Sequence, residues 1–179
     1  MDVAAVGAGT AALLYALLAL HSITTGAFMR PLSWARVAFV GALAGTALWA
    51  LTELATRTTP WTFPPVISAL ADLLRYGLWF WLLLLVIPAS ARRAAKGSRS
   101  GLRNVVISVF AVNALLLLAG FSGLRDNANR LALFGNLALP VFGLVLVEQL
   151  FRNVPEDFRW HAKPLCIAVG SFFLFDIYL

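Results

Sequence analysis

The chain has 179 residues, of which 61% are hydrophobic and 12% are charged. Soluble domains contain about 45–50% apolar residues, so this composition excludes an ordinary soluble protein and indicates a lipid environment. The net charge of +6 could suggest nucleic acid, but most of the 14 basic residues lie in predicted loops on one side of a membrane. Nucleic acid is therefore excluded as a partner.

The apolar runs are long and unbroken, as between residues 76 and 87. Only helices or closed barrels span a bilayer, and the strands of a barrel alternate polar with apolar residues. The sequence therefore predicts an all-α fold, a polytopic transmembrane helical bundle that forms a single domain over residues 1–179.

The first three spans are predicted at residues 3–29, 35–55 and 70–91. The first run follows Asp2 rather than a basic segment and is too long for a signal-peptide core, so we expect it to be retained. Three prolines between residues 56 and 65 stop the second helix. The third span is predicted to begin at residue 70, because an earlier start at Val66 would bring Arg75 to the middle of the membrane.

The second half begins with a basic loop over residues 92–103, which no bilayer core would hold. Three further spans are predicted, at 104–124, 131–151 and 164–179, separated by a polar turn at 125–130 and a polar loop at 152–163. The last run is shorter than the roughly 20 residues that a span needs, and it has no capping residue. We expect about six spans, the last one incomplete.

The basic residues are distributed unequally between the two predicted sides. One side holds ten of them, namely Arg30, Arg36, Arg92, Arg93, Lys96, Arg99, Arg103, Arg152, Arg159 and Lys163. The other side holds three, namely Arg57, Arg125 and Arg130. The positive-inside rule then predicts an N-terminus outside the cytoplasm and a multi-pass protein of the bacterial inner membrane.

Ionisable residues within spans are the candidate functional residues, because they are costly in lipid. Glu53, Asp72 and Arg75 are predicted to share one level near the outer ends of their spans. They form either an outward-facing sensing site or a set of side chains that reach into the headgroup region.

Asp176 is predicted near the middle of the membrane, with Asn113 at a comparable depth and Glu148 in the preceding span. His21 could face Asp176 if the bundle brings their helices together. These three candidates, Asp176, Glu148 and Asn113, either relay a signal or hold helices together through polar contacts.

Other motifs are few. Gly41 and Gly45 form a G-x-x-x-G pattern that permits close helix approach. The motifs H-E-x-x-H, G-x-S-x-G and G-x-x-x-x-G-K-[ST] do not occur in the sequence, and its single cysteine, Cys166, has no ligand at metal-binding spacing. We therefore expect no catalytic residue, metal or cofactor in this chain.

The second half contains a recognisable set of residues: Glu148, Gln149, Arg152, Asn153, Arg159, Trp160, Lys163 and Asp176. This set resembles the membrane region of the PEP-CTERM/exosortase-system histidine kinases of the PrsK type, best over residues 137–179. The resemblance implies a membrane-embedded sensory and anchoring module of a two-component sensor kinase that regulates exopolysaccharide and PEP-CTERM protein-sorting genes.

The same resemblance implies a GAF-like domain and a kinase core after this chain, with ATP and Mg bound there. It also implies a homodimer formed through the parent kinase and a cognate response regulator as partner. Neither His21 nor His161 would be the phosphoacceptor. Two alternatives remain open from the residues alone: a small transporter or membrane enzyme with a polar path through Asp176, Asn113 and Glu148, and a structural membrane subunit.

Overall fold

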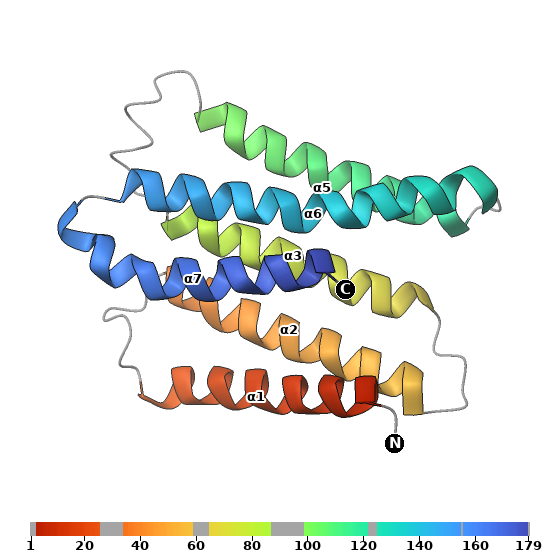
Figure 1. Cartoon of the computed structure of the whole chain (residues 1–179), viewed down its shortest axis with the longest axis horizontal. Helices are drawn as coiled ribbons and strands as arrows, with labels where there is room; N and C mark the ends of the chain where they lie inside the picture. Colours follow the sequence, from red (N-terminus) through yellow and green to blue (C-terminus); the bar gives the residue numbers. More distant parts are fainter. Residues whose placement is uncertain are drawn as a thin grey trace. The chain divides into compact units, whose positions relative to one another are not determined.

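The computed structural model describes residues 3–25, 34–58, 65–86, 99–121, 125–154 and 156–178. These residues form six helices, shown in Figure 1: α1 (Val3–Thr25), α2 (Trp34–Thr58), α3 (Pro65–Val86), α5 (Arg99–Phe121), α6 (Arg125–Asn153) and α7 (Glu156–Tyr178). The all-α fold class predicted from the apolar runs is thus confirmed.

Three of the described helices are long and apolar enough to cross a membrane. The qualifying segments are Ala5–Thr24, Trp34–Thr58 and Ile67–Val86, and α5 contains a shorter apolar segment at Asn104–Leu117. This supports the membrane protein that the composition predicts.

Several helices begin earlier than the sequence predicted. Helix α3 begins at Pro65 rather than at residue 70, because proline suits the first turn of a helix, where the missing N–H would have no partner. Helix α5 begins at Arg99, within the predicted basic loop. Helix α6 begins at Arg125, so the predicted polar turn at 125–130 is wrong. That segment contains no glycine or proline that would stop a helix.

The predicted polar loop at 152–163 is also wrong, because α6 runs to Asn153 and α7 begins at Glu156. The backbone N–H of Val154 donates to the carbonyl of Leu150 at 3.1 Å and continues the α6 hydrogen bonding past its end. Pro164 lies inside α7 instead of starting it. The acidic residues at the start of α7 favour this earlier N-terminus, because they complement the helix dipole.

The chain divides into two compact units, residues 1–82 and residues 83–179. In the first unit, the guanidinium Nη2 of Arg36 on α2 donates to the carbonyls of Ser22 and Ile23 near the end of α1, at 3.2 and 3.1 Å. A cation is stabilising at that helix end, where carbonyls have no intrahelical partner. Arg36 therefore links the start of α2 to the end of α1 through two hydrogen bonds.

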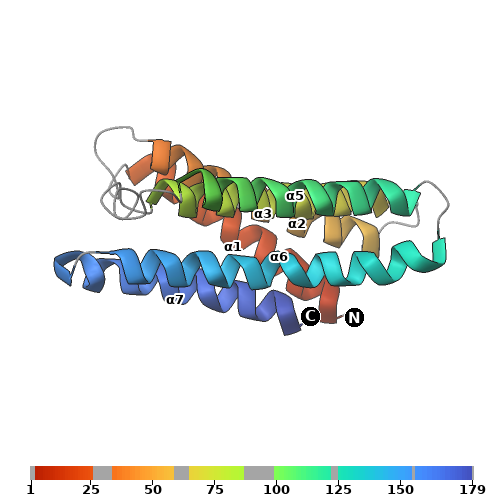
Figure 2. The same ribbon diagram turned by 90° about the horizontal axis from the view of Figure 1, so that it is seen from above.

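In the second unit, α6 and α7 lie side by side in both Figure 1 and Figure 2. Gly143 on α6 makes room for the ring of Phe173 on α7: a Cβ added to this glycine would lie 2.6 Å from two ring atoms. Phe173 is fully buried. The interior of this helix pair is therefore apolar, and its packing depends on the lack of a side chain at Gly143.

Candidate functional site

The most unusual side chain of the first unit is Arg75, which is only 2% exposed. It lies near the middle of α3, about 15 to 17 Å from each end of the helix at ~1.5 Å per residue. The span was expected to begin at residue 70, whereas α3 begins at Pro65, so Arg75 lies far from either end of the helix. A buried guanidinium inside an apolar helix requires compensation from its neighbours.

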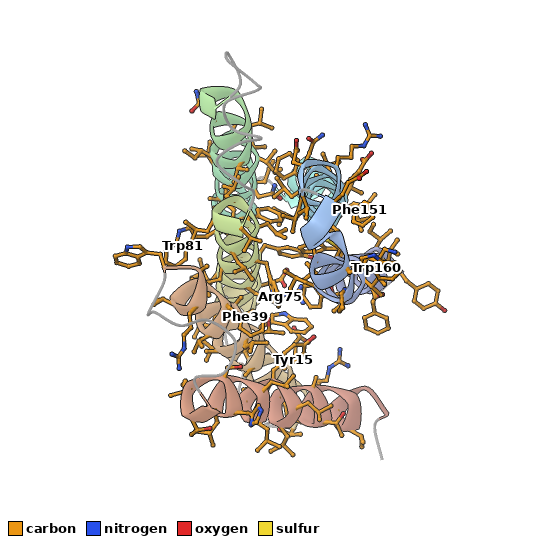
Figure 3. The ribbon with its side chains drawn as sticks, turned by 90° about the vertical axis from the view of Figure 1, so that its left-hand side faces the viewer. Tyr15, Phe39, Arg75, Trp81, Phe151 and Trp160 are labelled. Atoms are coloured by element: carbon orange, nitrogen blue, oxygen red, sulfur yellow. The ribbon has the colours of Figure 1, made fainter. Side chains whose placement is uncertain are left out.

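Arg75 is labelled in Figure 3, and two kinds of contact compensate its charge. Its Nη2 lies 2.6 Å from Oδ1 of Asp72, one turn earlier on α3. Its guanidinium carbon lies 4.0 Å from the ring centroid of Trp49 on α2 and 4.7 Å from that of Tyr76. Aromatic faces attract a cation, and more strongly where water is excluded. Arg75 is thus held by one carboxylate and two aromatic rings.

Gly45 brings the backbones of α2 and α3 close together at this site. A Cβ on Gly45 would lie 2.6 Å from a terminal methyl of Leu78 and 3.8 Å from the Cα of Arg75. Gly41, one turn earlier, leaves more room, because its Cβ would be 3.6 Å from Leu78. The two glycines of the G-x-x-x-G pattern therefore leave room for Leu78 of α3, and this fits the close helix approach that the spacing predicted.

A buried hydrogen bond lies beside the arginine on the same two helices. The indole N–H of Trp79 donates to Oγ1 of Thr46 at 3.0 Å, and that hydroxyl donates to the carbonyl of Ala42 at 2.8 Å. Thr46 is 1% exposed and Trp79 is 5% exposed. Since unsatisfied polar groups are expensive away from water, this pair fixes how α2 and α3 face each other.

Glu53 belongs to the same helix pair but does not share the carboxylate site of Arg75. Its Oε1 accepts a hydrogen bond from the hydroxyl of Ser68 at 2.6 Å, and its Oε2 lies 3.6 Å from Arg57. Of the predicted cluster, the structure joins Asp72 and Arg75 directly and gives Glu53 other partners. The Glu53 and Asp72 side chains are 28% and 31% exposed, whereas that of Arg75 is 3% exposed.

Sequence reasoning missed Thr46, Trp49, Tyr76 and Trp79, which surround or adjoin the arginine. Of these four residues, Trp49 is the one on the neighbouring helix whose ring lies against the guanidinium. The signal that could have found it is the antiparallel arrangement of α2 and α3, in which Trp49 falls at the level of Arg75. This inference requires the correct start of α3, which the sequence prediction did not have.

The candidates in the second unit lie in different surroundings. Asn113 is 7% exposed, donates to the carbonyl of Val109 at 2.8 Å, and has its Oδ1 against Gly135 of α6. Asp176 lies about 30 Å along α7 from Glu156 at ~1.5 Å per residue. Helix α7 thus begins before Pro164, and the place of Asp176 in the middle of the span stays a prediction. The pairing of Asn113 with Asp176 stays a prediction.

The residues that carry the family resemblance lie around the connection between α6 and α7. Arg152 pairs with Glu148 at 2.7 Å, and Asn153 donates to the carbonyl of Gln149 at 2.6 Å. The ammonium of Lys163 lies 3.8 Å from the ring centroid of Trp160, which is 74% exposed. The side chains of Arg159 and His161 lie outside the described residues. These contacts are local to each helix.

Within the described ranges, no group of three or more His, Cys, Asp or Glu side chains could hold a metal ion. Cys166, on α7, is buried and not in a disulfide. Comparison of the chain with protein-family models, curated proteins and solved structures found no match.

Proposed function

We propose that this chain is the membrane-embedded sensory and anchoring module of a sensor histidine kinase that regulates exopolysaccharide and PEP-CTERM protein-sorting genes. The observation that carries the sensory part is the Arg75–Asp72 pair in the middle of an apolar helix. Ionisable residues within membrane helices usually serve a function, because lipid makes them costly. The kinase part rests on the resemblance around α6 and α7.

In this proposal the module crosses the bacterial inner membrane six times, with its N-terminus outside. The basic side chains at the connection between α6 and α7 support this orientation, whereas in the first unit α2 has one arginine near each end. Arg36 lies at the turn between α1 and α2, whereas Arg57 lies in the last turn of α2, at its opposite end. Arg152 and Lys163 flank the connection between α6 and α7. Basic residues near the predicted inner ends of helices favour the cytoplasmic side.

A stimulus would act by changing how helices pack rather than by chemistry. The α2–α3 pair has two features suited to this role: close backbone approach at Gly45 and a charged group whose aromatic and carboxylate partners come from both helices. A small shift of α3 along α2 would change the contacts of Arg75 discontinuously, and such discrete changes propagate through packed helices.

The proposed parent protein continues after this module into a kinase core that binds ATP and Mg and forms a homodimer. That core would phosphorylate its own histidine and pass the phosphoryl group to a response regulator. Since α7 would end on the outer side in this topology, a cytoplasmic kinase core would require at least one further membrane crossing.

The test is a phosphorylation assay. The complete reading frame is expressed, membrane vesicles are prepared, and radiolabelled ATP is added together with Mg. We expect acid-labile, base-stable label on the protein, and we expect Asp176→Asn and Glu148→Gln to change its rate with insertion intact. Gly170→Ala on α7, whose added methyl would lie 3.9 Å from its nearest neighbour, is the control. A reading frame without a kinase core, or one that takes up no label, would refute the kinase proposal.

A transporter or membrane enzyme is the second candidate, and the mid-helix Arg75–Asp72 pair is the observation that favours it. Such pairs also mark substrate and ion pathways. It predicts solute uptake into proteoliposomes that is abolished by Arg75→Lys, a variant that keeps the charge but loses the planar group stacked on Trp49. A structural subunit, the third candidate, predicts neither phosphorylation nor transport and requires a partner for stable insertion.

A further inference from the structure

The start of α7 carries two opposite charges on the same face as an exposed tryptophan. Glu156, Trp160 and Lys163 follow one another at intervals of four and three residues, which places them on one side of the helix. Glu156 is exposed, and Trp160, labelled in Figure 3, is 74% exposed. The ammonium of Lys163 lies 3.8 Å from the ring centroid of Trp160, so its charge lies at the level of the tryptophan.

The same face continues along α7 as an apolar stripe. Ile167 and Leu174 are 67% and 58% exposed, and Tyr178 ends the stripe at 86% exposed. Trp160 and Tyr178 are about 27 Å apart along the axis at ~1.5 Å per residue. That distance is close to the ~30 Å hydrocarbon core, whose two boundaries Trp and Tyr favour. In the proposed topology, Trp160 therefore lies at the boundary between acyl chains and headgroups.

Outward from this boundary, the positive charge comes first and the negative charge second. The ammonium of Lys163 lies at the boundary itself, beside Trp160. Glu156 is four residues further out, which corresponds to ~6 Å at the helical rise. The headgroup layer is roughly 5–7 Å thick on each side of a bilayer. The two charges therefore lie near the inner and the outer limits of that layer.

A phospholipid headgroup that ends in a primary ammonium has the complementary order of charges. Its phosphate is attached beside the glycerol and the acyl chains, at the level of the Lys163 ammonium, and its own ammonium lies further out, at the level of Glu156. The lipid cannot reverse this order, because its acyl chains must stay in the hydrocarbon core. Both contacts would be charge-assisted hydrogen bonds, which are the strong kind.

The neighbouring helix shows the opposite order of charges. On α6, Arg152 is closer to the connection with α7 than Glu148, and the two side chains pair with each other at 2.7 Å. Outward from the membrane, the carboxylate of α6 therefore comes first and would repel a lipid phosphate. The order that suits such a headgroup is a property of α7.

We propose that the face of α7 formed by Glu156, Trp160, Lys163 and Ile167 binds a zwitterionic phospholipid with a primary ammonium, such as phosphatidylethanolamine. Lys163 donates to the phosphate, Glu156 accepts from the ammonium, and an acyl chain lies along Ile167. This inference rests on the membrane part of the proposed function and not on its kinase part. A chain that inserts into liposomes but takes up no label refutes only the kinase.

The first experiment is native mass spectrometry of the full chain in micelles that contain equal amounts of three lipids with identical acyl chains. Phosphatidylcholine keeps both charges but has no N–H on its ammonium, and phosphatidylglycerol keeps the phosphate but has no ammonium. We expect phosphatidylethanolamine to be retained about tenfold more than either, because each lacks one charge-assisted hydrogen bond. Equal retention of phosphatidylethanolamine and phosphatidylcholine, or stronger retention of phosphatidylglycerol, would overturn the proposal.

The second experiment assigns the preference to the two charges of α7. Glu156→Gln should remove the preference for phosphatidylethanolamine over phosphatidylcholine, whereas Lys163→Gln should lower the retention of all three lipids. Arg152→Gln is the matched control, because it removes an exposed cation from the same connection and should leave the preference unchanged. A preference that persists in Glu156→Gln, or that is lost in Arg152→Gln, would contradict the site on α7.

The third experiment reverses the order of the charges without changing their sum. Glu156→Lys combined with Lys163→Glu should abolish the preference, and a preference equal to that of the native chain would refute the proposed orientation of the lipid. Flotation of each variant with liposomes measures insertion separately. A native chain that does not insert would refute the membrane part of the proposed function together with this site, whereas insertion without any lipid preference would refute only the site.

Discussion

Two arginines of this chain make almost the same local contact in opposite surroundings. Arg75 pairs with Asp72 three residues earlier at 2.6 Å, and Arg152 pairs with Glu148 four residues earlier at 2.7 Å. The side chain of Arg75 is 3% exposed and that of Arg152 is 71% exposed. An ion pair within one helix therefore does not determine whether the arginine is buried or exposed. The neighbouring helix determines it.

The two helix pairs show why. In the first unit, α2 offers Trp49 to the guanidinium and a glycine that lets α3 come close, so the interior of the pair accepts a charge. In the second unit, the interior between α6 and α7 is filled by Phe173 against Gly143, and the ion pair stays outside. A charge is buried inside a helix pair only where the facing helix leaves space for the side chain and presents groups that interact favourably with the charge.

The largest effect is expected from Arg75→Ala, which removes the buried member of an ion pair and leaves its carboxylate and aromatic neighbours without it. We expect a loss of about 3–5 kcal/mol in the free energy of unfolding. The measurement is thermal or denaturant unfolding of the purified chain in detergent micelles. Arg75→Lys should be intermediate, because lysine keeps the charge but cannot stack as a plane. Full stability of Arg75→Ala would show that the buried contacts are not essential.

The next largest effect is expected at Gly143, where an added methyl would meet the ring of Phe173. Gly143→Ala should destabilise the α6–α7 pair by about 1–3 kcal/mol, since a packed ring cannot shift without moving its helix. Gly170→Ala is the matched control, because its nearest atom would be 3.9 Å away. Similar unfolding midpoints for the two variants would mean that the contact with Phe173 is not tight in solution.

A smaller effect is expected from Trp79→Phe, which keeps most of the buried ring and removes the hydrogen bond to Thr46. The loss should be about 0.5–1.5 kcal/mol, the net value of a typical hydrogen bond within a protein. Thr46→Val should cost at least as much, because it withdraws the acceptor and leaves the tryptophan N–H in place. Both variants can be compared by the temperature midpoint of their unfolding.

The smallest effect on the fold is expected from Arg152→Gln. Exposed ion pairs contribute roughly 0–1 kcal/mol, so the unfolding of the single chain should barely change. The measurement is the unfolding midpoint of the purified chain in detergent micelles, compared with that of Arg75→Ala. A loss of unfolding free energy as large as that of Arg75→Ala would contradict the expected difference between the two arginines.

The sequence by itself determined the all-α class and the membrane character, because these follow from long apolar runs that no other architecture accommodates. It also identified Arg75, Asp72, Glu53 and Glu148 as residues whose charge needs an explanation. These properties depend on composition and on neighbours along the chain.

Only the tertiary structure decided where those charges lie along their helices and which side chains surround them. The start of α3 at Pro65 moved Arg75 to the middle of its helix, and the start of α7 at Glu156 moved Asp176 toward its end. A helix boundary depends on small local differences in free energy, so a shift of several residues is easily missed from sequence. Which aromatic ring faces an arginine depends on the neighbouring helix, and no pattern within α3 contains that information.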